Sequence, residues 1–382
     1  MSTKLTTTEP VAPEAPPEPK GSGPSAGVLV AWTLVGCLAV VAIIVIAHNA
    51  RYGAVAPRIA NPAVHGAPIN VRPLLGWTHW VAILQSFALI SIVLIVALFV
   101  MAWRRYPKHP VLLMAIACTT LLWQDPIMNW APYAVYNPRL WHWPETWPLV
   151  SLSPTVEPFI VVPYVMFYLA PGLVGIWILR KIQRRRPVTS FVWRHPLITL
   201  ALLIYVIGFV YDAAQEIVLI RAQLYIYSQV IPFGSVFAGK PYQFPLLWES
   251  SLVTAVMIPA GILIYRDDTG KAVAEKLAQR VRVFRGRPAL GSFLVMVVIL
   301  NACYFFLYGG SFAAIRASGA ATSVACPYPF PEAKVYDPQG FYEQAGQPGP
   351  YSAGIWDGWE TGQSGRPKVT PPPEAGRCRS RA

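Results

Sequence analysis

The chain has 382 residues and a formal net charge of +13, and only 13% of its residues are charged whereas 54% are hydrophobic. Soluble domains carry about 25% charged residues, so this composition excludes an ordinary soluble enzyme. In a soluble protein the excess of positive charge would suggest nucleic-acid binding. Here it falls mainly in alternate loops between apolar runs, which is typical of membrane topology.

The first 25 residues are rich in Pro and Glu and lack the basic start of a signal peptide, so we expect a disordered tail at 1–25. Seven apolar runs follow, each of about 20 residues and so long enough to cross a bilayer as a helix. They occupy 26–47, 80–103, 110–129, 158–179, 196–220, 245–265 and 289–308. The sequence therefore predicts an all-α integral membrane protein with a seven-helix domain at 26–308.

The basic residues predict the orientation of these helices. The loops after the second, fourth and sixth runs contain most of the Lys and Arg residues, and the loops between them contain few. The positive-inside rule then places the basic loops in the cytoplasm, the N-terminus inside and the C-terminus outside. We expect a multi-pass protein of the cytoplasmic membrane.

Two further segments lie outside the predicted spans. Residues 273–284 combine apolar residues at helical spacing with basic residues, which fits either an amphipathic helix on the inner leaflet or an ordinary cytoplasmic helix. The extracytoplasmic tail, 309–382, is rich in Pro, Gly and aromatic residues. We expect its part 325–360 to pack loosely on the outer face and 361–382 to be disordered.

Two cysteines, Cys326 and Cys378, lie in this tail and so on the oxidising side of the membrane. They could form a disulfide. Two free thiols are the favoured alternative, because Cys378 lies in a segment with the composition of a flexible end.

The most informative feature of the spans is a pair of acids, Asp212 and Glu216, which lie one helical turn apart on one face of the run 196–220. An acid near the centre of a membrane helix costs about 2.5–3.5 kcal/mol on insertion scales. Such residues face protein or water, and they mark functional sites by default. The pair therefore predicts a site inside the outer half of the bundle.

The predicted topology brings further polar residues to the same depth, at the outer ends of the second, third, fourth and sixth runs. These residues are His79, Gln124, Asp125, Asn129, Glu157 and Glu249. Several carboxyl groups in a medium of low dielectric constant cannot all ionise, so protonated acids lie beside ionised bases. This arrangement suits general acid–base catalysis, and we predict that Asp212, Glu216, Asp125 and Glu249 supply it.

Structural roles are the alternative for several of these residues: Glu157 as a helix cap, Glu216 as a partner of Arg221, His79 as an interface residue and Asp125 in a turn with Asn129. Carboxylates with one His could also hold a metal in a helical bundle. However, the spans contain no Glu-x-x-His pair, and the chain has no HExxH or CxxC motif. We therefore predict no metal and no cofactor.

The loop between the third and fourth spans is rich in Trp, Tyr and Pro. It fits either a belt of turns on the outer leaflet or a lid with aromatic walls over the acidic site. In the second case Asn129, Tyr133 and Tyr136 would orient substrate oxygens, with Gln124, His79 and Glu157 nearby. Aromatic faces would also stabilise a developing positive charge.

Three short motifs in this region carry a family resemblance: Trp123-Gln124-Asp125-Pro126, Asn129-Trp130 and Tyr136-Asn137-Pro138. With these motifs and its multi-span layout, the chain resembles the AveC-like spirocyclase family of actinobacterial membrane proteins over roughly 27–310. The namesake of that family acts in avermectin biosynthesis and is associated with spiroketal formation and dehydration. The resemblance implies acid-catalysed closure or dehydration of a hydroxy-ketone, and it implies no particular catalytic residues.

We therefore predict a membrane enzyme that cyclises or dehydrates an apolar, polyketide- or lipid-like hydroxy-ketone. Its partners would be this substrate and membrane lipids, without nucleic acid. The alternative is a non-enzymatic scaffold, lipid-binding protein or carrier of the cell envelope, with the aromatic C-terminal tail as a partner-binding segment. A carrier needs access from both sides, whereas the predicted acids all lie on one side.

Overall fold

A computed structural model describes residues 79–144, 147–326, 328–330, 335–344 and 351–352, together with the isolated helical residues Thr33, Cys37 and Val40. These three belong to a separate unit, Met1–Val41, and the fold below is that of the other unit. The predicted tail 1–25, Cys378 and the predicted disordered end 361–382 lie outside the described residues. So does the first predicted span, 26–47, apart from the three isolated residues.

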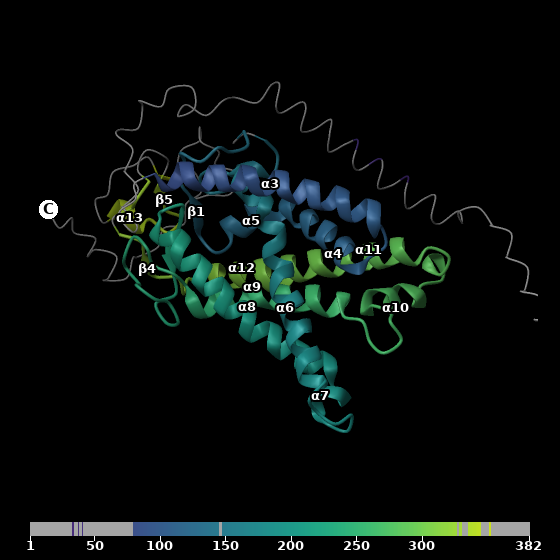
Figure 1. Ribbon diagram of the computed structural model, residues 1–382. Helices are drawn as coiled ribbons and strands as arrows, with labels where there is room; N and C mark the ends of the chain where they lie inside the picture. The colour runs from purple at the N-terminus through teal and green to yellow at the C-terminus, as the bar shows by residue number, and fades with distance from the viewer. Residues whose placement is uncertain are drawn as a thin grey trace, which may run out of the picture. The chain divides into compact units, whose positions relative to one another are not determined.

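Six helices in the described part are long and apolar enough to cross a membrane, and they correspond to the other six predicted spans (Figure 1). Three of them begin with proline in the first turn, where the missing N–H removes no intrahelical bond. The six helices are α3 (Trp80–Arg105), α4–η2–α5 (Pro110–Trp130), η4–α6 (Phe159–Gln183), α8 (Pro196–Arg221), α9 (Leu246–Ile264) and α11–η6–α12 (Pro288–Ser318). The last of these continues to Ser318, beyond the predicted end at 308.

Glycines allow the central helices α6, α8 and α9 to approach closely. A Cβ atom on Gly172 of α6 would lie 2.7 Å from the Cα atom of Gly261 on α9. One on Gly208 of α8 would lie 2.8 Å from a side-chain carbon of Thr254 on α9. Small residues are the usual means by which membrane helices reach van der Waals contact, since lipid supplies no hydrophobic driving force between them.

Helix α3 lies at the edge of the bundle, and Ala88 is its only buried residue. Its principal neighbour is η4 (Phe159–Tyr164). Apolar side chains such as Phe87, Val93 and Leu98 are more than half exposed on it. An apolar helix exposed in this way is suited to contact with lipid.

The basic loops meet at one end of the bundle. The guanidinium of Arg180, at the end of α6, donates a hydrogen bond to the carbonyl of Arg266, which follows α9. In the same region Lys276 pairs with Asp267. Helix α10 (Val273–Arg280) lies there and buries Ala274 and Ala278, so the predicted amphipathic segment is a helix that packs one face on the chain itself. Short elements α7 (Phe191–Arg194) and η5 (Arg282–Phe284) complete the basic loops.

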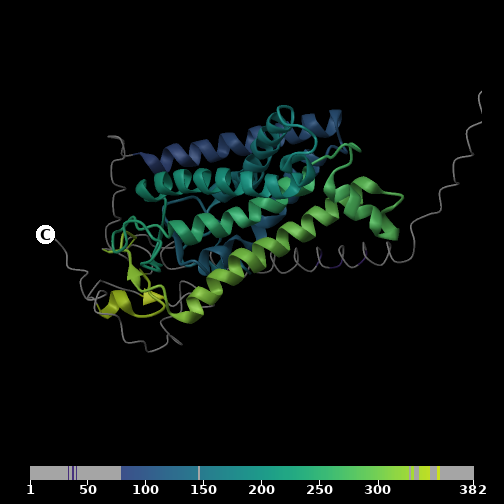
Figure 2. The ribbon, with the colours of Figure 1, turned by 90° about the horizontal axis from the view of Figure 1, so that it is seen from below.

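The opposite end carries a cap of short strands. Antiparallel pairs join β1 (Ala134–Tyr136) to β2 (Tyr225–Tyr227) and β3 (Gln229–Val230) to β4 (Ser323–Val324), and β5 (Val335–Tyr336) runs parallel to β6 (Tyr351–Ser352). These pairs tie together the loops after α5, after α8 and after α12. The short helices η3 (Val150–Leu152) and α13 (Phe341–Gln344) also belong to segments at this end. Figure 2 shows the C-terminal strands and α10 at opposite ends of the helices.

The C-terminal segment packs more tightly than the sequence predicts. Tyr336 and Tyr342 are fully buried, in one apolar cluster with Tyr133 of the first cap loop and Ile226 of β2. Arg316 of α12 reinforces this contact: it stacks 4.1 Å from the ring of Tyr133 and donates hydrogen bonds to the Tyr336 hydroxyl and to a backbone carbonyl. The predicted loose packing of this segment is therefore wrong for these residues.

The prediction of a free thiol at Cys326 is also wrong. This cysteine is disulfide-bonded, and its partner lies outside the described residues. Cys37, Cys118 and Cys303 are free thiols.

Candidate active site

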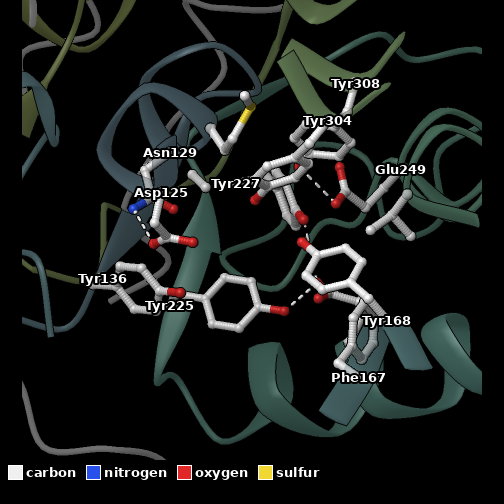
Figure 3. Close-up of a pocket in the computed structure, with 14 residues that line it drawn as sticks. Asp125, Asn129, Tyr136, Phe167, Tyr168, Tyr225, Tyr227, Glu249, Tyr304 and Tyr308 are labelled. Atoms are coloured by element: carbon white, nitrogen blue, oxygen red, sulfur yellow. Dashed lines mark hydrogen bonds between the residues drawn. The ribbon is translucent and has the colours of Figure 1, made fainter. Parts of the chain in front are cut away.

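Three of the predicted acids share one cavity between the helices and the cap. Asp125, Glu216 and Glu249 line it together with Asn129 and Tyr136. Figure 3 shows Asp125 and Asn129 on one side and Glu249 on the other, with tyrosine hydroxyls between them. The cavity has a volume of about 40 Å³. This is room for one or two water molecules, so a substrate-sized ligand requires the walls to move.

Glu216 lies on the buried stripe of α8, which repeats every fourth residue and also contains Gly208 and Asp212. Its Oε2 atom accepts a hydrogen bond from the Tyr225 hydroxyl and a second, 3.2 Å long, from the Tyr227 hydroxyl. Both tyrosines belong to β2, where alternate residues share one face of the strand. β2, the strand that follows α8, therefore directs two tyrosine hydroxyls toward Glu216 on that helix.

Glu249 lies in the first turn of α9 and faces the last span. Its Oε1 atom accepts a 2.7 Å hydrogen bond from Tyr308, whereas its Oε2 atom is buried without a hydrogen-bond partner. Tyr308 and Tyr304 come from η6 (Tyr304–Gly309), a π-helical segment between α11 and α12. Such segments occur frequently at functional sites, because the extra residue in the turn redirects side chains.

Asp125 forms a second acidic pair with Glu157. The Asn129 amide donates 3.0 Å hydrogen bonds to both carboxyl groups, and the two carboxyls are hydrogen-bonded to each other. Glu157 reaches this position because the aromatic loop folds back on itself, with the Trp143 N–H bonded to the Glu157 carbonyl at 2.9 Å.

Burial raises the pKa of Glu157 well above its ordinary value, and the neighbouring Asp125 charge and hydrogen bond raise this pKa further. Glu157 therefore holds its proton more tightly than an exposed glutamate does.

Asp212 is fully buried but does not line the cavity. It lies against Ser250 of α9, close enough for their charges and dipoles to interact, but neither of its oxygens is in hydrogen-bonding geometry. Its charge also acts on Glu216 and Glu249. Asp212, a predicted catalytic residue, therefore lies outside the lining of the cavity.

Three other predicted site residues lie away from the cavity. The Gln124 amide donates a 2.8 Å hydrogen bond to Asn301 of α11, so it joins two helices. Tyr133 faces Arg316 in the cap. His79 is exposed and precedes the first residue of α3. The suggested pairing of Glu216 with Arg221 is also not formed, because Glu216 is bonded to tyrosines and Arg221 stacks on Tyr242.

Sequence reasoning missed the most numerous group in the cavity wall, its tyrosines. A signal for them exists: hydroxyls inside membrane spans need buried partners, and Tyr304 and Tyr308 recur at helical spacing in the last span. Six tyrosines line the cavity, and besides the predicted Tyr136 they are Tyr168, Tyr225, Tyr227, Tyr304 and Tyr308. Within the described ranges, no three His, Cys, Asp or Glu side chains lie together in a way that could hold a metal ion.

A family model described as "Spirocyclase AveC-like" matches residues 103–336. The chain belongs to this family. The match begins and ends later than the range of roughly 27–310 over which the sequence resembles the family. It includes β4 and β5 of the cap and every residue that lines the cavity of this AveC-like protein. No curated protein and no solved structure matches the chain.

Proposed function

We propose that this AveC-like protein is a multi-pass enzyme of the cytoplasmic membrane that closes or dehydrates an apolar hydroxy-ketone of polyketide or lipid type. The observation that carries the proposal is the cavity itself. Carboxyl groups from α5, α8 and α9 and six tyrosines surround one small buried space. The membership of the spirocyclase family supports a cyclase-type reaction at this place.

The proposed reaction needs a proton donor and a proton acceptor on either side of one carbon atom. A hydroxyl of the substrate adds to the ketone carbon and gives its proton to a carboxylate, while a carboxylic acid gives its proton to the carbonyl oxygen, which forms a cyclic hemiketal. A second protonation releases that oxygen as water and leaves an oxocarbenium ion. A second hydroxyl then adds and gives its proton to a carboxylate, so a dihydroxyketone becomes a spiroketal and one water molecule.

Dehydration uses the same oxocarbenium ion. If a carboxylate removes a proton from the carbon next to the cation, the product is a cyclic enol ether, and one water molecule has again been lost. The position of the second hydroxyl relative to the carboxylate therefore decides between closure and dehydration. Both outcomes return the catalytic acid and base to their starting states.

The contacts of the acids suggest their roles. Glu249 has one oxygen held by Tyr308 and one without a partner, so it can exchange a proton with a substrate atom in the cavity. Glu216 accepts two tyrosine hydroxyls, which fixes its position and allows it to stabilise the cation electrostatically. The Asp125–Glu157 pair is placed to supply a proton from the opposite wall.

The alternative, a scaffold with a partner-binding C-terminal tail, fits the cap less well. Among the described residues of the tail, aromatic side chains such as Phe341 and Tyr342 are buried against this chain. They are therefore not available for another protein without unfolding of the cap.

A stereochemical assay tests the proposed function. The purified protein in lipid nanodiscs is incubated with a synthetic long-chain dihydroxyketone, and the products are separated by chiral chromatography. Free acid gives a racemic spiroketal, whereas a structured cavity should give one enantiomer in excess and accelerate its formation. A racemic product at the rate seen without protein would overturn the proposal.

A further inference from the structure

A second and larger hollow opens on the side of the bundle between α3 and α8. Its volume is about 510 Å³, and its lining is mainly apolar. The α3 wall runs from Leu84 through Ser91 to Ile95, and the α8 wall from Tyr211 to Leu219. We call this hollow the lateral groove. Its volume is in the range of about 300–1,000 Å³ that small-molecule sites occupy.

The lateral groove lies at the depth of the acids. On α8, residues 211, 215 and 219 line the groove, and each directly precedes a member of the buried stripe at 212, 216 and 220. Adjacent residues of a helix point about 100° apart, so α8 presents one face to the acidic cavity and the neighbouring face to the groove.

One aromatic side chain separates the two spaces. Phe167 of α6 lines both the lateral groove and the acidic cavity. The centroid of its ring lies 5.5 Å from the ring centroid of Tyr211 on the groove side and 5.3 Å from that of Tyr168 on the cavity side. A rotation of this side chain would therefore connect the apolar hollow with the acids.

The acidic cavity and the lateral groove have complementary volumes. The acidic cavity has room for a few atoms, which suffices for a reacting carbonyl group but not for a hydrophobic chain. The lateral groove lacks the acids but has room for such a chain.

We propose that the lateral groove holds the apolar chain of the substrate, which enters sideways from the bilayer, and that Phe167 is the partition past which the reactive carbonyl reaches the acids. This inference rests on the proposed function and names the route and the chemical class of its substrate. The groove would select molecules with an aliphatic chain attached to the hydroxy-ketone.

Photolabelling tests the groove without requiring turnover. The probe is a dihydroxyketone that carries a dodecyl chain with a terminal diazirine, and labelled peptides are mapped by mass spectrometry in nanodiscs. We expect labels in the α3 and α8 walls, and competition by the unlabelled dodecyl dihydroxyketone but not by dodecanol. Ser91→Trp, which fills the groove, should reduce labelling about tenfold, and Val93→Trp on the exposed face of the same helix should not.

The inference would be overturned by equal labelling in Ser91→Trp and Val93→Trp, by equal competition by dodecanol, or by disulfide cross-links between Ser91→Cys and cysteines placed in 26–47. The last would show that the first apolar run fills the groove. Groove labelling without any product would instead refute the proposed function alone. Selective product formation with labels elsewhere would refute the groove alone. If Ser91→Trp fails to fold, the labelled peptides of the wild-type chain still decide whether the probe lies in the groove.

Discussion

At the scale of single residues, the acids differ in how their burial is compensated. Glu216 and Glu249 accept hydrogen bonds from tyrosines, and Glu157 shares Asn129 with Asp125. Asp212 has no hydrogen-bond partner for either oxygen. Burial of a polar group without a hydrogen-bond partner costs about 1–3 kcal/mol of folding free energy. A protein retains such a group where function benefits.

Asp212→Asn should therefore separate stability from activity. The neutral amide removes a buried group that can ionise, so we expect the free energy of unfolding to rise by about 1 kcal/mol or more. Product formation should fall about tenfold or more, because the Asp212 charge acts on Glu216 and Glu249 and favours a cationic intermediate. Thermal unfolding in detergent and the chiral product assay measure the two effects. A less stable variant with full activity would contradict both expectations.

Glu157 makes a contribution to stability that depends on pH. Its pKa is raised in the folded protein, so the folded state binds this proton more tightly than the unfolded chain does. The contribution is complete below the ordinary value of 4.5 and is lost as pH rises toward the raised pKa. Glu157→Gln keeps a hydrogen-bond donor at every pH. As pH rises above 4.5, the unfolding midpoint of this variant should therefore fall less than that of the wild type. If the unfolding midpoints of the variant and the wild type change with pH in parallel, this role of Glu157 is refuted.

The acids could be predicted from the sequence because charged residues inside apolar runs are conspicuous, and because loop charges place them at one depth. The hydrogen-bond partners could not. Tyr225 and Tyr227 reach Glu216 only because β2 turns back against α8, and Gln124 reaches Asn301 through a helix crossing. Both contacts depend on tertiary packing, which no local pattern encodes.

At the scale of the helices, the glycine contact between α6 and α9 fixes the position of the acids. Gly172 and Gly261 touch through their backbones, so any side chain at either position forces the helices apart. Because Glu249 lies on α9 and Tyr168 on α6, a separation here would widen the acidic cavity.

Gly172→Ala measures this contact. The added Cβ would lie 2.7 Å from the Gly261 Cα, a backbone atom that cannot move alone. Overpacking of this kind costs about 1–3 kcal/mol, which a lower thermal unfolding midpoint would report. Gly286→Ala is the matched control, because its Cβ would meet no atom within 4 Å. Equal effects of the two substitutions would mean that the helix crossing tolerates a wider spacing.

At the scale of the whole molecule, the six described spans separate basic loops from a strand cap. The alternation follows from loop composition and could be predicted. The cap could not, because its strands are two or three residues long and pair segments that lie far apart in the chain. Its tight packing joins the C-terminal residues to the loop after α5, as in the contact of Tyr336 with Tyr133.

Cysteine labelling tests the proposed orientation. In a variant whose free thiols Cys37, Cys118 and Cys303 are replaced by alanine, Lys240→Cys lies in the cap-side loop and Thr269→Cys in a basic loop. A membrane-impermeant maleimide added to intact cells should label only Lys240→Cys, and Thr269→Cys should react after permeabilisation. The reverse pattern would place the acidic cavity on the cytoplasmic side.

The central claim is that the acids around the cavity perform the chemistry, and Glu249→Gln tests it most directly. The amide keeps the shape of the side chain but can neither give nor take the catalytic proton. The variant should fold with an unfolding midpoint near that of the wild type and form spiroketal about a hundredfold more slowly or worse. Glu275→Gln on α10, at the opposite end of the bundle, should keep the wild-type rate. A folded Glu249→Gln protein with the wild-type rate and enantiomeric excess would contradict the account.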